Sequence, residues 1–303
     1  MLLVVLVVLV ATAVGQLAHA HSRHAQALAR ATLTLMLYAL VPFVAYVNIA
    51  HLHVTTGDGA GLGLAYLVLA TVGTLAWLLG RRVFGLPSPA VGGLICVVIL
   101  ANTSYLGLPL VVAVLGASNL PFGIAFDQLV SSPTLFTAGF GVGAAFGTKA
   151  GERPAERLRA FVTRNPPLLA VVAGLVVPAS AAPEVLVHAS HVVVLALLPL
   201  GFFVLGVNLA FEHGDGRWPL PAPDRVTVAA VALRMAVAPL LLLALSTAPV
   251  AIPSAYLLLA AMPSGINSLL VGHAYGLDLR VISAAIAWST VVAMVVVFVA
   301  SFF

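Results

Sequence analysis

The sequence predicts an all-α polytopic membrane protein of ten transmembrane helices, arranged as two inverted five-helix repeats with broken crossing helices 4 and 9. Three observations lead to this prediction. Apolar residues make up 62% of the chain and charged residues 7%, whereas a soluble domain has about 25% charged residues. Apolar runs of membrane-spanning length recur along the chain. Similar polar interruptions lie inside the fourth and the ninth run.

Each predicted transmembrane helix is an apolar run close to the length of about 17–25 residues that crosses a bilayer. The second run contains Pro42 and the seventh contains Pro199, and proline inside a helix predicts a kink. The predicted helices are residues 2–18, 28–51, 61–80, 90–115, 121–147, 166–181, 189–211, 226–247, 251–275 and 279–302.

The basic residues predict how these helices are oriented. All 13 Lys and Arg residues except Arg234 lie at the odd-numbered connections. Loops that carry Lys and Arg stay in the cytoplasm, so we expect both termini outside and the basic loops inside a plasma or bacterial inner membrane. The formal net charge is +4, but the basic residues form no single stripe, so nucleic-acid binding is not expected.

The first apolar run has a second interpretation. Because it is followed by Ala18, His19 and Ala20, it resembles a secretory signal with a small-residue cleavage site. No positive charge precedes the run, however, and its removal would leave nine spans and break the repeat. We therefore expect residues 1–20 to be retained.

Two internal similarities indicate the repeat. Residues 101–116 align without a gap on residues 261–276, and the sequence ALVP at 39–42 resembles ALLP at 196–199. Five helices per half is an odd number, so the second half would lie inverted in the membrane. Chance alignment of Ala-, Leu- and Val-rich segments is the alternative explanation. The predicted parts are repeat 1 at residues 1–147, a cytoplasmic link at 148–165 and repeat 2 at 166–303.

Several motifs, in order along the chain, resemble the auxin efflux carrier family, which belongs to a bile-acid and sodium symporter-like superfamily of transporters. Its bacterial-type members are described as carriers of small organic acids. The motifs are NTSYLGLP at 102–109, RNPPL at 164–168, LPLG at 198–201 with LGVNL at 205–209, and AMPSG at 261–265 with YGLD at 275–278.

The resemblance implies a scaffold of helices 1, 2, 6 and 7 and a moving transport unit of helices 3–5 and 8–10. It also implies that the fourth and ninth helices unwind and cross near the middle of the membrane. Plant members carry a proline where this chain has Ser268. The second break is therefore either less sharp or lies at Pro263 and Gly265.

The two interruptions form the predicted substrate site. Lipid cannot hydrogen-bond an open backbone, so a break at membrane depth has to line a cavity, and paired breaks mark the binding site in many secondary transporters. A helix that restarts after such a break points N–H groups at an anion. The alternative is a kinked helix whose small polar residues only pack against neighbours. The predicted substrate-binding residues are Asn102, Thr103, Ser104, Tyr105, Gly107, Pro109, Pro263, Ser264, Gly265, Asn267 and Ser268.

Two ionisable residues lie inside predicted helices, Asp127 in the fifth and Arg234 in the eighth. Such residues are costly in a membrane and are functional candidates by default. Asp127 is predicted to carry the proton of a proton-coupled cycle. Arg234 is predicted either to attract the substrate anion or to hold a counter-charge for Asp127. The alternatives are a structural ion pair, or an arginine that reaches to the cytoplasmic interface.

These features predict a secondary transporter, not an enzyme, that carries a small organic acid anion such as a dicarboxylate or an auxin-like carboxylate by elevator-type alternating access. The expected coupling ion is H⁺ rather than Na⁺, and no cofactor and no metal are expected. A sodium-coupled symporter of the bile-acid type and a non-transporting membrane sensor are the alternatives. The sequence leaves the oligomeric state open, a homodimer included.

Overall fold

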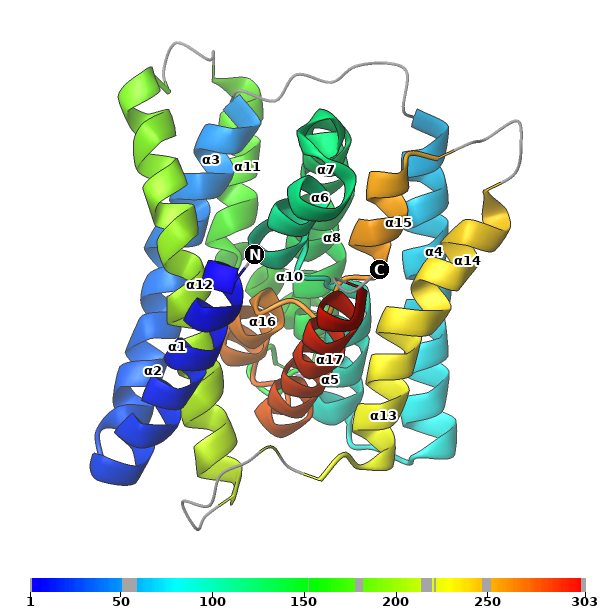
Figure 1. Cartoon of the computed structure of the whole chain (residues 1–303). Helices are drawn as coiled ribbons and strands as arrows, with labels where there is room; N and C mark the ends of the chain where they lie inside the picture. The colour runs from blue at the N-terminus through cyan, green and yellow to red at the C-terminus, as the bar shows by residue number, and fades with distance from the viewer. Residues whose placement is uncertain are drawn as a thin grey trace.

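The computed structural model describes residues 2–50, 59–151, 153–177, 182–213, 220, 222–246 and 252–300. These residues form helices and no strand (Figure 1). Six described helical stretches are long and apolar enough to cross a membrane, so the chain is a multi-pass membrane protein. They are Ala25–Ala50, Gly61–Val83, Leu120–Phe146, Glu184–Phe211, Arg225–Leu245 and Leu279–Val297.

The described residues of the first half of the chain form α-helices that alternate with short 3₁₀- and π-helical turns. They are α1 (Leu2–His21), α2 (Ala25–Leu35), η1 (Met36–Leu40), α3 (Val41–Ala50), α4 (Gly59–Leu78), η3 (Leu79–Val83), α5 (Ser88–Ile99), η4 (Thr103–Gly107), α6 (Leu108–Leu115), η5 (Ala117–Asn119), α7 (Leu120–Phe126), η6 (Asp127–Ser131), α8 (Ser132–Thr134), η7 (Leu135–Gly139) and α9 (Phe140–Phe146).

The second half begins with a short helix in the predicted cytoplasmic link, which the sequence analysis did not foresee. The elements are α10 (Pro154–Thr163), α11 (Pro166–Val176), α12 (Glu184–His213), α13 (Arg225–Ala232), η9 (Leu233–Val237), α14 (Ala238–Leu245), α15 (Ser254–Ala260), α16 (Asn267–Tyr275) and α17 (Leu279–Ala300).

The other four predicted spans, the first, fourth, sixth and ninth, are shorter or interrupted. Among them, Leu6–His21 and Pro166–Val176 are shorter apolar helices. The total of ten crossings and the inverted relation of the halves stay predictions. The ends of several predicted spans lie outside the described residues: 51, 178–181, 247, 251 and 301–302.

Four helices widen into a π-helical turn just before a proline. The elements η1, η4, η6 and η9 each end two residues before a proline, at Pro42, Pro109, Pro133 and Pro239. Proline cannot donate to the carbonyl four residues earlier and collides with it. A wider turn relieves this collision, and such turns are frequent at functional sites. The predicted distortion near Pro42 and Pro109 is thus a π-helical turn in each case.

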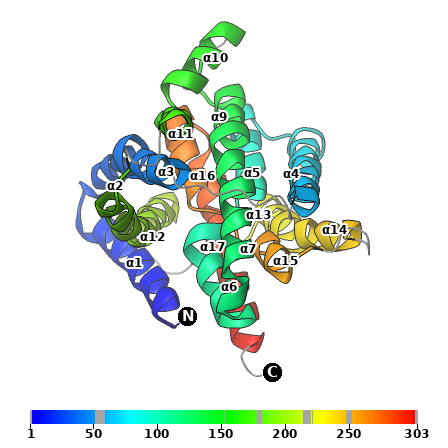
Figure 2. The ribbon, with the colours of Figure 1, turned by 90° about the horizontal axis from the view of Figure 1, so that it is seen from above.

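The helices pack in two groups (Figures 1 and 2). One group holds α1, α2, α3, α11 and α12, and the other holds α4 to α9 with α13 to α17. Small residues bring α1 and α12 together: a β-carbon at Gly15 would lie 2.1 Å from the carbonyl oxygen of Phe203, and one at Gly206 would lie 2.1 Å from that of Thr12. Close backbone approach at glycine is the usual way in which membrane helices pack.

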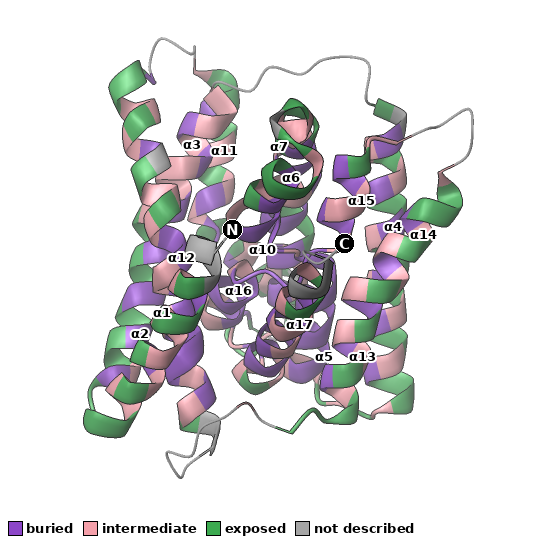
Figure 3. Cartoon of the chain, viewed as in Figure 1, coloured by how far each residue is buried: buried purple, intermediate pink, exposed green. Residues whose placement is uncertain are grey.

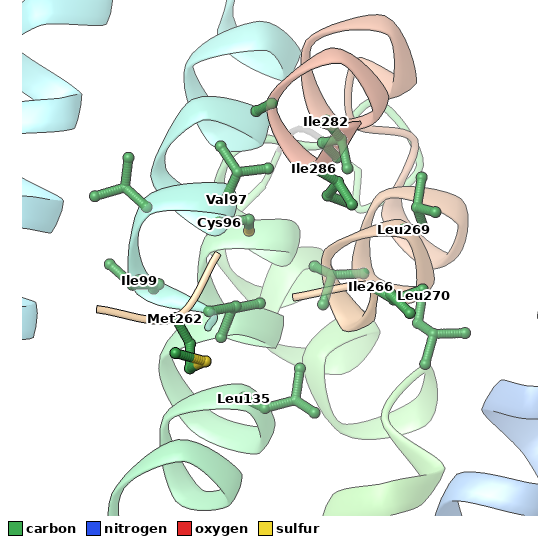
Figure 4. Close-up of a cluster of buried hydrophobic side chains, with 14 of the residues drawn as sticks. Cys96, Val97, Ile99, Leu135, Met262, Ile266, Leu269, Leu270, Ile282 and Ile286 are labelled. Atoms are coloured by element: carbon green, nitrogen blue, oxygen red, sulfur yellow. The ribbon is translucent and has the colours of Figure 1, made fainter. Parts of the chain in front are cut away.

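Buried residues face the interior of both groups, and exposed residues lie on the outer faces of the helices (Figure 3). Many of the exposed residues are large and apolar. Leu195, Leu240 and Val296, for example, are exposed, as expected for surfaces that lipid covers. Inside the second group, Cys96 of α5, Leu269 of α16 and Ile286 of α17 belong to one apolar cluster (Figure 4). This cluster supports the ends of the interrupted helices.

Candidate functional site

Two interruptions of the helical backbone lie against one another. The first separates α5 from η4, and the second separates α15 from α16. The Asn102 amide donates to the carbonyl of Pro263 at 2.8 Å, and the Gly265 amide donates to that of Leu100 at 2.7 Å. Ala101 and Ser264 thereby form an isolated antiparallel bridge. The sequence correctly located both breaks; their position at the middle of a bilayer stays a prediction.

Gly265 permits this close contact. A β-carbon at this position would lie 2.8 Å from the carbonyl oxygen of Ala101 and 3.2 Å from that of Leu100. Because both neighbours are backbone atoms that take part in the bridge, neither can move without separating the two interruptions.

We therefore expect Gly265→Ala to lower the stability of the protein by about 1–3 kcal/mol, the usual cost of overpacking a tight interior. Thermal unfolding of the purified protein in detergent measures the effect. Gly141→Ala is the matched control, because a β-carbon at Gly141 would meet nothing within 4 Å. Equal unfolding temperatures for the two variants would show that the bridge tolerates a side chain.

The helix that restarts after the first interruption presents free amides. Its first internal hydrogen bond runs from the Gly107 amide to the carbonyl of Asn102, at 3.1 Å. The amides of residues 103–106 precede this bond and have no acceptor within the helix. They carry the partial positive charge of a helix N-terminus.

Asp127 faces this helix N-terminus. Its carboxylate is buried and accepts hydrogen bonds at Oδ1 from the hydroxyls of Thr103, at 2.5 Å, and Ser104, at 2.7 Å. At Oδ2 it accepts a bond from the Gln128 amide at 3.1 Å. Two of the predicted substrate ligands are therefore hydrogen-bonded to Asp127 itself.

Polar groups on both interruptions remain without partners in the described part of the chain. Both side-chain atoms of Asn102 are buried with no hydrogen-bond partner, as are the Oδ1 atom of Asn267 and the hydroxyl of Ser268. Buried polar groups normally have partners, because a lost hydrogen bond costs about 1–3 kcal/mol. Unpartnered side chains on both interruptions therefore indicate a place that accepts a polar ligand.

A small cavity of about 30 Å³ lies between the two interruptions. Sequence analysis placed seven of its lining residues at the site and missed Ser131 and Ser132. These serines lie four and five positions after Asp127, so the i+4 rule of a helix face would have found Ser131. The cavity is lined by Leu100, Ala101, Asn102, Thr103, Ser104, Tyr105, Asp127, Ser131, Ser132, Leu135, Gly265, Ile266 and Asn267.

Other predicted site residues have structural contacts instead of lining the cavity. The Ser264 hydroxyl donates to the carbonyl of Val97 at 2.7 Å, and its amide donates to the Ser289 hydroxyl at 3.1 Å. Pro263 takes part in the bridge through its carbonyl. The predicted residues outside the lining are Gly107, Pro109, Pro263, Ser264 and Ser268.

Arg234 also lies outside the cavity lining. Its guanidinium is buried and donates to the carbonyls of Val98, at 3.0 Å, and Ala260. Among the described residues it forms no ion pair with Asp127, so the predicted counter-charge is not made in this structure. The guanidinium does not pair with Asp127 because it donates its hydrogen bonds to helix carbonyls, whose positions a sequence does not reveal.

Comparison with known proteins shows which proteins the chain resembles. The family model described as "Membrane transport protein" matches residues 158–301. An uncharacterised transporter of Methanocaldococcus jannaschii is 25% identical to this chain, across 97% of this chain and 96% of that protein. The second half of the chain thus resembles the membrane transport protein family. Both findings agree with the resemblance of the motifs to the auxin efflux carrier family.

The matched family is one of membrane transporters. The region matched by the family model contains the second interruption and Arg234. The archaeal relative aligns with nearly the whole chain.

Proposed function

We propose that this protein is a secondary transporter of a small organic acid anion, such as a dicarboxylate or an auxin-like carboxylate. The observation that carries the proposal is the buried, unpartnered side chain of Asn102 beside a helix N-terminus. Free amides and a partial positive charge favour a carboxylate. The Asn102 and Asn267 side chains would complete its hydrogen bonds.

Asp127 couples a proton to this anion in the proposed cycle. The ionised carboxylate of Asp127 already accepts hydrogen bonds from the hydroxyls of Thr103 and Ser104. A substrate carboxylate would need the same donors. Two anions this close in a water-poor cavity repel each other strongly. A proton on Asp127 removes the repulsion, so the substrate enters together with one proton.

Movement of the two helix groups delivers the substrate across the membrane in this proposal. The cavity, at about 30 Å³, has room for one or two water molecules but not for a dicarboxylate, so binding requires one wall to open. The group of α1, α2, α3, α11 and α12 is the natural scaffold, and the other group carries both interruptions. An elevator-like slide of the second group within ten inverted helices, with both termini outside, fits this arrangement.

The test is uptake and counterflow of labelled malate, malonate and indole acetate in proteoliposomes. Asn102→Ala and Asn267→Ala are each expected to lower transport about tenfold or more, since a hydrogen bond to a charged group contributes about 1.5–3 kcal/mol. Asn119→Ala is the matched control, because the Asn119 side chain donates to the nearby carbonyl of Leu115 and does not line the cavity.

Transport that both cavity variants leave unchanged would contradict the site. Replacement of external Na⁺ by choline is expected to leave transport unchanged, and a strict requirement for Na⁺ would favour the sodium-coupled alternative. Binding of these anions without any flux would favour a membrane sensor.

A further inference from the structure

We infer that Arg234 is a positioning residue that acts as a fixed cation and joins the C-terminal ends of both interrupted helices. Its guanidinium donates from one nitrogen to the carbonyl of Val98 and from another to the carbonyl of Ala260. Val98 is the penultimate residue of α5, and Ala260 is the last residue of α15. One side chain from η9 thus bonds both helix ends.

Helix ends in a membrane need such a partner. The last carbonyls of a helix receive no hydrogen bond from within the helix, and lipid offers no donor. At the end of α5, the carbonyl of Val97 accepts a hydrogen bond from the Ser264 hydroxyl, and the carbonyl of Leu100 accepts one from the Gly265 amide. Both donors belong to the second interruption. Arg234 supplies the donor for the carbonyl of Val98 between them.

Charge balance supports the same role. Each helix C-terminus carries about −0.5 elementary charge, so two ends that meet carry about −1. Arg234 is buried, and among the described residues it forms no ion pair with an acidic side chain. Its positive charge therefore balances the two helix ends. Its Nε atom is buried and has no hydrogen-bond partner among the described residues.

Arginine suits this position better than lysine. The planar guanidinium carries donors in a fixed fork that reaches two acceptors at once, whereas the lysine ammonium is a compact point charge. The π-helical turn η9 contains Arg234 and ends two residues before Pro239. Because the arginine occupies one acceptor position on each of these carbonyls and places a positive charge beside them, they are poor ligands for a coupling Na⁺, which agrees with proton coupling. This consequence for coupling rests on the proposed function, whereas the clamp itself does not.

Hydrogen exchange measured by mass spectrometry on the purified full chain tests the inference without a substrate. In Arg234→Gln, peptides that contain Asn102 or Gly265 are expected to exchange about tenfold faster or more, because charge-assisted hydrogen bonds are lost. Peptides from α1 and α12, in the other helix group, are expected to exchange as in the wild type. Arg225→Gln, an exposed arginine at the start of α13, is the control and should change neither set.

Arg234→Lys is the second variant and keeps the test valid if Arg234→Gln does not fold. Lysine is expected to give a smaller increase at the same two interruptions, since one ammonium cannot hold both carbonyls with the geometry of a fork. Unchanged exchange at the interruptions in the lysine variant would overturn the inference, as would faster exchange spread equally over α1 and α12. Because no anion is added, neither result depends on whether the chain transports organic acids.

Discussion

In proteoliposomes with a pH difference of one unit, Asp127→Asn is expected to stop accumulation of the anion, whereas the wild type accumulates it about tenfold per coupled proton. Asparagine keeps the size of the carboxyl group and an oxygen for the Thr103 and Ser104 hydroxyls, but it cannot exchange a proton. The variant should therefore still carry out counterflow, in which labelled and unlabelled anion exchange without net proton movement. Labelled malonate in vesicles, with and without the pH gradient, measures both activities.

The matched control is Asp224→Asn. Asp224 caps the N-terminus of α13 by accepting a bond from the Thr227 amide at 2.7 Å, and asparagine caps a helix as well as aspartate does. This control should accumulate the anion as the wild type does. If Asp127→Asn still accumulates the anion, Asp127 has no role in the coupling step. If the variant loses both counterflow and accumulation, Asp127 has a role in substrate binding instead.

Sequence reasoning located the interruptions because their composition is so unlike the rest of the chain. A polar triplet, a glycine and a proline inside an apolar run cannot form an ordinary lipid-facing helix, so the breaks at residues 100–102 and 261–266 follow from local chemistry. Asp127 was found for a similar reason, as a carboxylate inside an apolar run. The two interruptions and the buried carboxylate can each be recognised from the residues that surround them in the sequence.

Contacts between distant segments were beyond the reach of the sequence. Nothing local shows that Thr103 and Ser104 donate to Asp127, because these residues are 24 and 23 positions away from it. The hydrogen-bond partners of Arg234 were not foreseen, because a sequence shows side chains and not the carbonyls of Val98 and Ala260; attraction of the substrate anion by Arg234 stays a prediction. The π-helical turns were also missed, although four of them end two residues before a proline such as Pro109, which is a signal that a sequence can supply.

A disulfide between the two helix groups is expected to stop transport completely if the groups slide past one another. A β-carbon at Gly201 of α12 would lie 3.3 Å from the β-carbon of Ile266, in the second interruption, and a disulfide needs about 3.5–4.5 Å. Gly201→Cys with Ile266→Cys, made in a Cys96→Ala background, therefore needs a shift of only a few tenths of an ångström. Oxidation should reduce anion uptake to the level of empty vesicles, and a reducing agent should restore it.

A pair inside one group provides the control. A β-carbon at Gly174 of α11 would lie 3.1 Å from that of Ile49 in α3, and both helices belong to the group assigned as the scaffold. Gly174→Cys with Ile49→Cys uses the same two residue types, but its disulfide should leave transport nearly unchanged because the scaffold does not move internally. Full activity of the oxidised Gly201 and Ile266 pair would contradict a sliding mechanism. Loss of activity in both oxidised pairs would mean that internal flexibility of the helices, rather than relative movement of two rigid groups, carries the substrate.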